Sequence, residues 1–124
     1  MRLLLLDQHF SVCRLSSDSP IPDWAYQSSF FNICKTDEEL SIVAETKYCP
    51  EQITTESNWR ALKVQGPLDF NLTGILASLT QPLADAGISI FAISTYDTDY
   101  ILLKETCLEK TKAVLTQAGH SFLD

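Results

Sequence analysis

The chain has 124 residues, of which 45% are hydrophobic, with only four glycines and five prolines. This composition excludes long disordered stretches and describes one ordinary domain or two very small ones. Sixteen acidic residues against nine basic ones give a formal net charge of -7, which opposes binding to nucleic acid or to anionic lipid.

No apolar run in the sequence approaches the roughly 20 residues of a membrane helix. The run from Leu3 to Leu6 is closed at once by Asp7 and is too short for a signal peptide. Four cysteines are widely spaced, without a C-x-x-C pair, and neither histidine stands at ligand spacing from them. We therefore expect a cytoplasmic protein with reduced thiols, no metal site and no cofactor.

The N-terminal half, residues 1–58, is expected to form a degenerate α/β domain. Alternating residues over 3–15 predict a strand, and a proline-led short helix is expected at 24–26. Two apolar stretches around an acidic turn predict a hairpin over 30–45. The polar segment 49–58 is interpreted as a linker or a shortened helix.

The C-terminal half, residues 59–124, has clearer patterns and is expected to be a second domain. It begins with a strand at 59–64, after which apolar residues from Leu72 onward recur at three and four positions and predict a helix. Asn71 or Thr73 is expected to cap the start of this helix.

The rest of this half continues the alternation of strands and helices. Gly87 is expected to end the first helix. A hairpin is predicted over 88–103, then a helix over 108–118 and a final strand over 120–123. A β-α-β-β-α-β order folds into an antiparallel four-stranded sheet with both helices on one face.

The two predicted hairpins resemble each other when the sequence is shifted by 60 positions. Identical residues then meet at Phe31, Ile33, Asp37, Glu45 and Thr46. We therefore predict an α+β protein made of two tandem ferredoxin-like units, and pairing the two units would cover their exposed sheet surfaces.

The segment from Leu68 to Glu105 reads LDFNLTGILASLTQPLADAGISIFAISTYDTDYILLKE. It resembles the ACT-like domain of the bacterial tandem ACT proteins and of the CASTOR arginine sensors. The resemblance is strongest at Gly74, in the AGISIF run and in STYDTDYIL, and it extends to residues 36–43 of the first half.

The resemblance implies a ligand held at an interface between ACT units. Since the chain holds a single unit of the ligand-binding type, a homodimer would supply the facing surface. The site residues implied are Asp69, Phe70, Asn71, Gly74, Thr95, Tyr96 and Asp99, with Ser89 and Ile90 contributed by the facing unit.

These residue types suit an amino acid. A loop that feeds a helix N-terminus presents free N–H groups to an α-carboxylate, and Asp99 can pair with an ammonium group. Leu72 stands where the arginine sensors carry an acidic residue for the guanidinium. Arginine is therefore disfavoured, and a smaller or more apolar amino acid is an equally good expectation.

Structural interpretations stand beside these functional ones. Gly74 is equally well explained by close packing of the helix on the sheet. Asp97 and Asp99 are also ordinary turn residues, Tyr96 is a candidate for packing on the sheet, and His120 is expected at the surface.

We predict an amino-acid-binding regulatory protein and not an enzyme. The sequence has no G-x-S-x-G, G-x-G-x-x-G or P-loop motif, and no nucleophile with a base at a defensible spacing. The alternative is a ligand-free interaction or dimerisation module. Nothing in the sequence identifies the partner protein that would be regulated.

Overall fold

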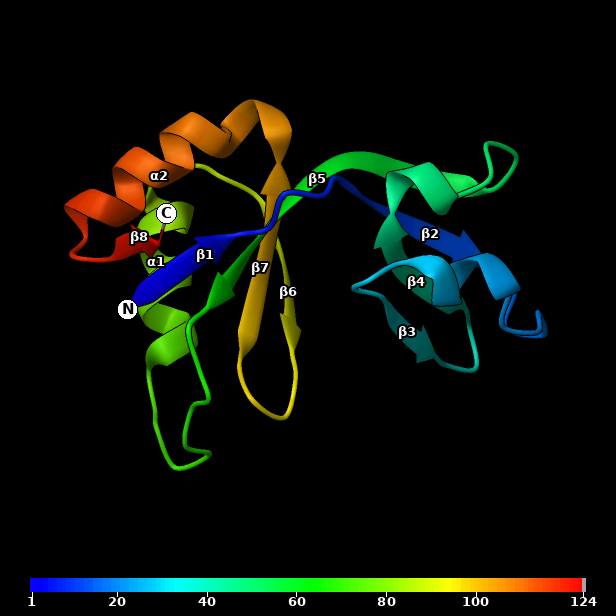
Figure 1. Cartoon of the computed structure of the whole chain (residues 1–124), viewed down its shortest axis with the longest axis horizontal. Helices are drawn as coiled ribbons and strands as arrows, with labels where there is room; N and C mark the ends of the chain where they lie inside the picture. Colours follow the sequence, from blue (N-terminus) through cyan, green and yellow to red (C-terminus); the bar gives the residue numbers. More distant parts are fainter. Residues whose placement is uncertain (124) are drawn as a thin grey trace. The chain divides into compact units, whose positions relative to one another are not determined.

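The computed structural model describes residues 1–123 and divides into two compact units (Figure 1). The N-terminal unit is Gln8–Trp59, and the C-terminal unit combines Met1–Asp7 with the chain from Arg60 onward. The expected ranges 1–58 and 59–124 differ from this division because the first seven residues belong to the C-terminal unit. Leu3 is fully buried in the core of that unit.

The C-terminal unit contains a five-stranded mixed sheet in the order β6-β7-β5-β1-β8. Its strand β1 lies between β5 and β8, antiparallel to the first and parallel to the second. The expected all-antiparallel sheet is therefore wrong at this edge, since an added N-terminal strand separates the first and last strands of the β-α-β-β-α-β order. The strands are β1 (Arg2–Leu5), β5 (Thr54–Val64), β6 (Ile90–Ser94), β7 (Asp99–Lys104) and β8 (Ser121–Leu123).

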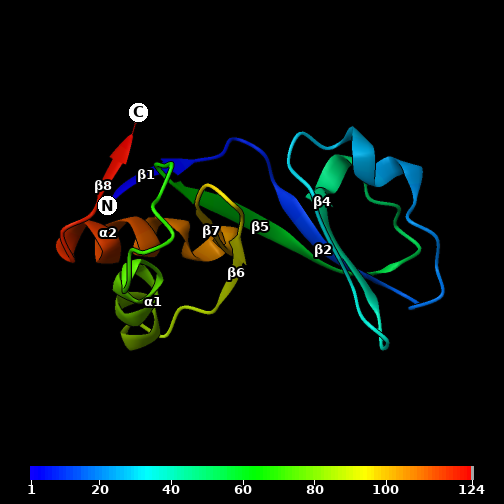
Figure 2. The ribbon, with the colours of Figure 1, turned by 90° about the horizontal axis from the view of Figure 1, so that it is seen from below.

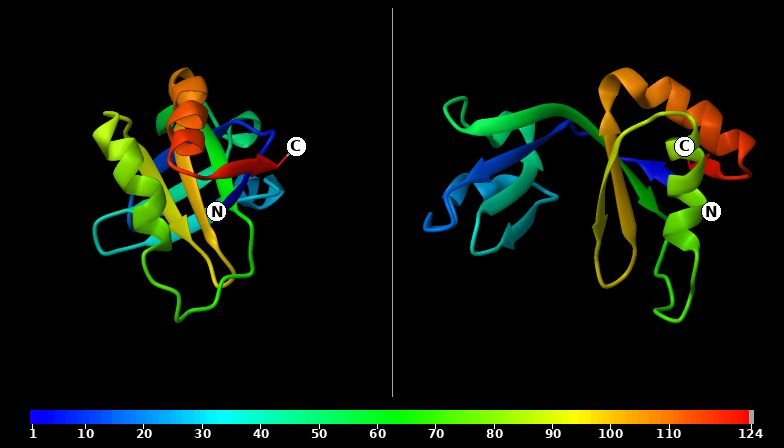
Figure 3. Two further views of the ribbon diagram at one scale, coloured as in Figure 1. Left: turned by 90° about the vertical axis from the view of Figure 1, so that its left-hand side faces the viewer. Right: turned by 180° about the vertical axis from the view of Figure 1, so that it is seen from behind.

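Helices α1 (Ile75–Asp85) and α2 (Leu108–Gln117) cover one face of this sheet (Figures 2 and 3). Both contribute to the same core cluster as strand residues two apart, such as Leu62 and Val64, and side chains two apart share a sheet face. Gly87 ends α1 as predicted, with φ 74° and with the next N–H donating to the Leu83 carbonyl. None of the helices in residues 1–123 is long and apolar enough to cross a membrane.

The N-terminal unit is an antiparallel sheet in the order β3-β4-β2-β5, closed by the first half of β5. Its strands are β2 (Phe10–Leu15), β3 (Asn32–Lys35) and β4 (Leu40–Glu45). The predicted single strand over 3–15 is thus two strands, β1 and β2, one in each unit.

The N-terminal unit contains two short 3₁₀ helices, Asp23–Gln27 and Thr46–Tyr48, and no α-helix among its described residues. The first follows Pro22 as predicted. Residues 54–58, expected to be a linker or helix, are the start of β5. Their inward-facing side chains are hydroxyls and not apolar groups, as at Ser57, whose Oγ lies 3.0 Å from Oγ of Ser11. This part of the strand therefore lacks the alternation of apolar and polar residues from which a strand is predicted.

The two predicted hairpins are both present. Equivalent residues of the two hairpins lie 59 positions apart in the sequence, however, and not 60. Lys35 pairs with Leu40 in one hairpin, and Ser94 pairs with Asp99 in the other. Each turn also closes in the same way, with Thr36 donating to the Glu39 carbonyl and Thr95 to the Thr98 carbonyl. Because a shift of one residue turns every side chain to the other face, the identities at 60 positions do not mark equivalent sites.

A cavity at the start of helix α1

The loop between β5 and α1 and the turn between β6 and β7 lie at the same end of the C-terminal unit (Figure 3). Two hydrogen bonds and one close backbone approach hold the turn against the loop and the end of β5. Leu68 donates its N–H to the Asp97 carbonyl over 2.7 Å, and the buried Thr98 hydroxyl donates to the Val64 carbonyl over 2.7 Å. A Cβ on Gly66 would lie 3.1 Å from the Asp97 carbonyl oxygen, so the two backbones approach closely.

A cavity of about 340 Å³ lies against this loop and turn. Its size falls within the range of small-molecule sites. Among the predicted site residues, the lining includes Asp69, Phe70, Gly74, Thr95, Tyr96 and Asp99. The lining also includes Leu72, which the resemblance placed at the position of the guanidinium-binding residue. It further includes Leu68, Ile75, Leu76, Ser94, Asp97 and Thr98, which the sequence had not assigned to a site.

Helix α1 begins at this cavity without a side-chain cap. The predicted caps Asn71 and Thr73 are wrong, since the cap position is Gly74. Asn71 instead donates its N–H to Oδ1 of Asp69 over 2.8 Å, which closes a local turn in the loop. The first N–H groups of a helix have no intrahelical acceptor, so this end of α1 offers free donors and a positive dipole end to an anion.

Gly74 adopts a left-handed backbone conformation, with φ 76°. A Cβ at this position would meet nothing within 4 Å. Close packing against the sheet therefore does not explain the glycine, and its conformation does.

Gly74→Ala is expected to lower the free energy of unfolding by about 1 kcal/mol, because an L-residue is strained at this φ while the space for its methyl group is open. Urea unfolding followed by circular dichroism measures this cost. Gly74→Asn is the matched control, because asparagine tolerates the left-handed region better and should cost less. Equal stability of alanine and glycine at this position would contradict the strain explanation.

Asp99 and Ser94 form a polar pair on the cavity wall. They face each other across the β6–β7 ladder, and the Ser94 hydroxyl donates to Oδ1 of Asp99 over 2.6 Å. Ser94 thus orients the carboxylate, and its hydroxyl hydrogen is used in this hydrogen bond. None of the described residues that line the cavity is a histidine, the usual base beside a serine nucleophile.

Two exposed aromatic rings stand beside these polar groups. Phe70 and Tyr96 are 70% and 80% exposed, and their ring centroids lie 4.8 Å apart in an edge-to-face arrangement. The interpretation of Tyr96 as a packed sheet residue is wrong. With Leu72, also exposed, the rings form an apolar rim of the cavity beside the polar pair of Ser94 and Asp99.

Three predicted site residues do not line the cavity. Asn71 belongs to the loop but points its N–H into the Asp69 turn. Ile90 pairs with Leu103 at the other end of the hairpin and packs on the core, and Ser89 precedes it on the surface. A place for Ser89 and Ile90 in a facing subunit stays a prediction.

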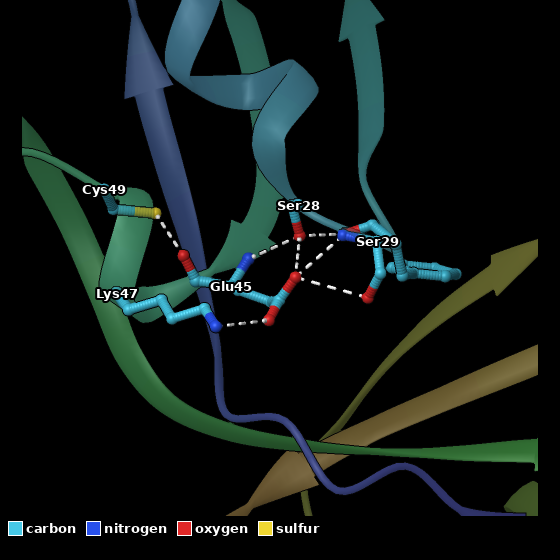
Figure 4. Close-up of polar contacts among 6 residues, drawn as sticks. Ser28, Ser29, Glu45, Lys47 and Cys49 are labelled. Atoms are coloured by element: carbon cyan, nitrogen blue, oxygen red, sulfur yellow. Dashed lines mark hydrogen bonds and ion pairs between the residues drawn. The ribbon is translucent and has the colours of Figure 1, made fainter.

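The N-terminal unit holds a separate polar cluster around the buried Glu45 (Figure 4). Its Oε2 accepts the Ser29 N–H over 2.7 Å and also lies within hydrogen-bond distance of the Ser28 and Ser29 hydroxyls. Burial alone would raise the pKa of Glu45. These donors, with the Lys47 ammonium 3.8 Å from Oε1, outweigh burial and hold the pKa below its ordinary value.

The neighbouring Cys49 carries a half-buried thiol. Its Sγ lies 3.4 Å from the Glu45 carbonyl oxygen, to which it donates (Figure 4). Burial, together with the nearby Cys13, raises the pKa of Cys49 to about 12. A raised pKa lowers the fraction of thiolate, the nucleophilic form, at neutral pH.

The family model of the ACT domain matches residues 54–117. The chain belongs to the ACT-domain family. A second family model, described as an N-terminal domain, matches residues 8–52, which fall within the N-terminal unit. The predicted family resemblance is confirmed, and the two halves of the chain match different families.

Similar proteins include both a solved structure and a curated relative. Protein Atu0741 from Agobacterium tumefaciens is 41% identical, with a TM-score of 0.94 over 98% of this chain and 91% of that one. The human cytosolic arginine sensor for mTORC1 subunit 1 is 34% identical over 110 residues, 82% of this chain. The ACT-domain chain spans only about a third of that relative, 32% of its length.

A more distant structure shares the fold. The ligand-free regulatory subunit of aspartate kinase from Thermus thermophilus has a TM-score of 0.62 at 14% identity, over 91% of this chain and 95% of that one. The ACT domain here therefore has the α+β architecture of known regulatory domains.

Proposed function

We propose that this ACT-domain protein binds a free amino acid in the cavity at the start of α1 and acts as a regulatory protein without catalysis. The observation that carries the proposal is the pairing of an uncapped helix N-terminus with the Asp99 carboxylate on the wall of one cavity. Free N–H groups suit an α-carboxylate and Asp99 suits an α-ammonium, so the cavity complements both charges of a zwitterion.

The rim around the cavity supports a homodimer. Phe70, Leu72 and Tyr96 present exposed apolar surface beside the acidic side chains of the lining. A second copy, placed with its Ser89 and Ile90 toward the rim, would remove this surface from water and enclose the ligand. Two equivalent sites per dimer follow from the symmetry of such an interface.

Leu72 sets the expected class of ligand side chain. An apolar residue at this point of the lining offers no partner for a guanidinium. The human relative is named an arginine sensor, but arginine is disfavoured here for this reason. Three aspartates in the lining (Asp69, Asp97 and Asp99) disfavour an acidic side chain and would attract a basic one, so Leu72 alone disfavours arginine.

We further propose a cytoplasmic location and a regulatory role, by similarity to a relative. The relative is named cytosolic, and a cytoplasmic location with a regulated partner protein fits an amino-acid sensor. A ligand would shift such a protein between states only by binding them unequally. The exposed rim also favours the alternative, a dimerisation module without ligand.

Thermal unfolding against each of the twenty amino acids tests the proposal. A ligand at 100 times its dissociation constant stabilises the folded state by about 2.7 kcal/mol, so one amino acid, or a few related ones, should raise the melting temperature. Asp99→Asn should weaken that binding about tenfold, the effect of roughly 1.4 kcal/mol.

Asp97→Asn is the matched control, since Asp97 lines the same cavity but does not accept from Ser94. It should retain most of the affinity. A flat response to all twenty amino acids, with a stable dimer in solution, would replace the sensor by the dimerisation module.

A further inference from the structure

Helix α1 contains a proline in its third turn, Pro82. A proline has no N–H, so it cannot donate to the carbonyl four residues earlier, which belongs to Ser78. That carbonyl is left without its helical donor. An interior proline therefore requires another donor, either water or a side chain.

The side chain of His120 provides this donor. Nε2 of His120 lies 3.0 Å from the Ser78 carbonyl oxygen. The expected surface position of His120 is wrong, since the residue is only 8% exposed. Its backbone N–H donates to the Leu115 carbonyl at the end of α2, which fixes the residue between the two helices and β8.

The geometry assigns the tautomer of the ring. A carbonyl oxygen only accepts, so Nε2 must carry the hydrogen. In a neutral ring Nδ1 then presents a lone pair. The amino nitrogen of Met1 lies 3.0 Å from Nδ1 and is a donor, in agreement with this assignment.

The contact reaches the candidate cavity through the backbone. Ser78 accepts from His120 and donates its own N–H to the Gly74 carbonyl over 2.9 Å. Gly74, Ile75 and Leu76 line the cavity. The two peptide groups on either side of Ser78 are therefore both held, at the end of the turn whose first residues line the cavity.

We propose that His120 is a positioning residue for the first turn of α1, because it replaces the hydrogen bond that Pro82 removes from the helix. Nε2 of the ring carries the hydrogen that this bond needs. The consequence for ligand affinity rests on the proposed function. The positioning of the helix does not, and it is tested separately.

A double-mutant cycle tests the replacement. His120→Phe keeps a buried aromatic ring and loses the donor, and it should lower the melting temperature by roughly 4–8 °C. It should also speed amide hydrogen exchange at Ser78 about tenfold. In a Pro82→Ala background, the restored N–H can bond to the Ser78 carbonyl, so His120→Phe should cost less than half as much.

Two further measurements separate positioning from simple packing. His120→Gln places an amide N–H near the Nε2 position and should retain slow exchange at Ser78. Long-range ¹⁵N–¹H NMR at mildly alkaline pH should identify the Nε2–H tautomer of His120. An Nδ1–H tautomer, or equal costs of His120→Phe with and without Pro82, would overturn the proposal.

The effect of His120 on binding is measured with the amino acid that raises the melting temperature in the thermal-unfolding experiment. His120→Phe should weaken its binding severalfold, and His120→Gln should not. If the mutant cycle gives the expected result but His120→Phe leaves ligand affinity unchanged, His120 positions the helix without affecting the cavity. A flat amino-acid panel would contradict the proposed function while the cycle still decides the role of His120.

Discussion

Leu83→Ala is expected to lower the free energy of unfolding of the C-terminal unit by roughly 2–5 kcal/mol, the range for a leucine truncated in a closed core. Leu83 is fully buried on the inward face of α1, in the cluster that contains Leu79 and Leu115. Close-packed neighbours on two helices and the sheet cannot collapse into the space left behind. Both α-helices lie in the C-terminal unit, so far-UV circular dichroism during urea unfolding reports this change.

Leu72→Ala is the matched control for this truncation. The same atoms are removed, but Leu72 is 54% exposed in the loop before α1. Its effect should stay within about 0.5 kcal/mol, as for ordinary surface positions. A large loss of stability from Leu72→Ala, or a small one from Leu83→Ala, would contradict the assignment of core and rim.

The patterns of the C-terminal half predicted its elements because each is determined locally. The spacing of Leu79 and Leu83 places them on one helical face, and Gly87 supplies the positive φ that ends the helix. The position of β1 was not predictable in this way. Its pairing with β5 and β8 joins residues far apart in the sequence, and a strand's own pattern does not specify its neighbours.

The sequence motifs predicted part of the candidate cavity, because they indicate where the backbone forms a loop or a turn. Gly74 and the STYD segment meet because the hairpin turn is fastened to the loop at Leu68 and Thr98. The orientation of Ser94 toward Asp99 depends on the ladder register, which residue types alone leave open. The same limit explains the repeat, where chance identities favoured a shift of 60 over the structural 59.

His120 shows how a local rule can fail for a physical reason. A lone histidine near the chain end is ordinarily a surface residue, yet Pro82 leaves the Ser78 carbonyl without its helical donor and the buried His120 ring lies within hydrogen-bond distance of it. The signal in the sequence was the proline inside a helical pattern, since a removed N–H implies a partner elsewhere. Its identity required the structure.

Glu45→Gln is expected to lower the free energy of unfolding of the N-terminal unit by roughly 2–3 kcal/mol at neutral pH, because hydrogen bonds to a charged acceptor are replaced by weaker ones. Glu45 is 5% exposed and holds the Ser28–Ser29 segment to the end of β4. Both tryptophans, Trp24 and Trp59, lie in the N-terminal unit. Their fluorescence during urea unfolding measures this loss.

The same carboxylate makes the N-terminal unit acid-sensitive. The pKa of Glu45 in the folded state lies below its ordinary value of 4.5. The ionised form therefore stabilises the fold above that pH, and the contribution is lost as the pH falls from about 4.5 through the lower folded pKa. The slope attributable to one proton is at most about 1.4 kcal/mol per pH unit.

Glu45→Gln should remove this part of the acid dependence, whereas Glu38→Gln, on an exposed turn, should leave it intact. An unchanged acid profile in Glu45→Gln would show that the bonds at Ser28 and Ser29 do not depend on the charge.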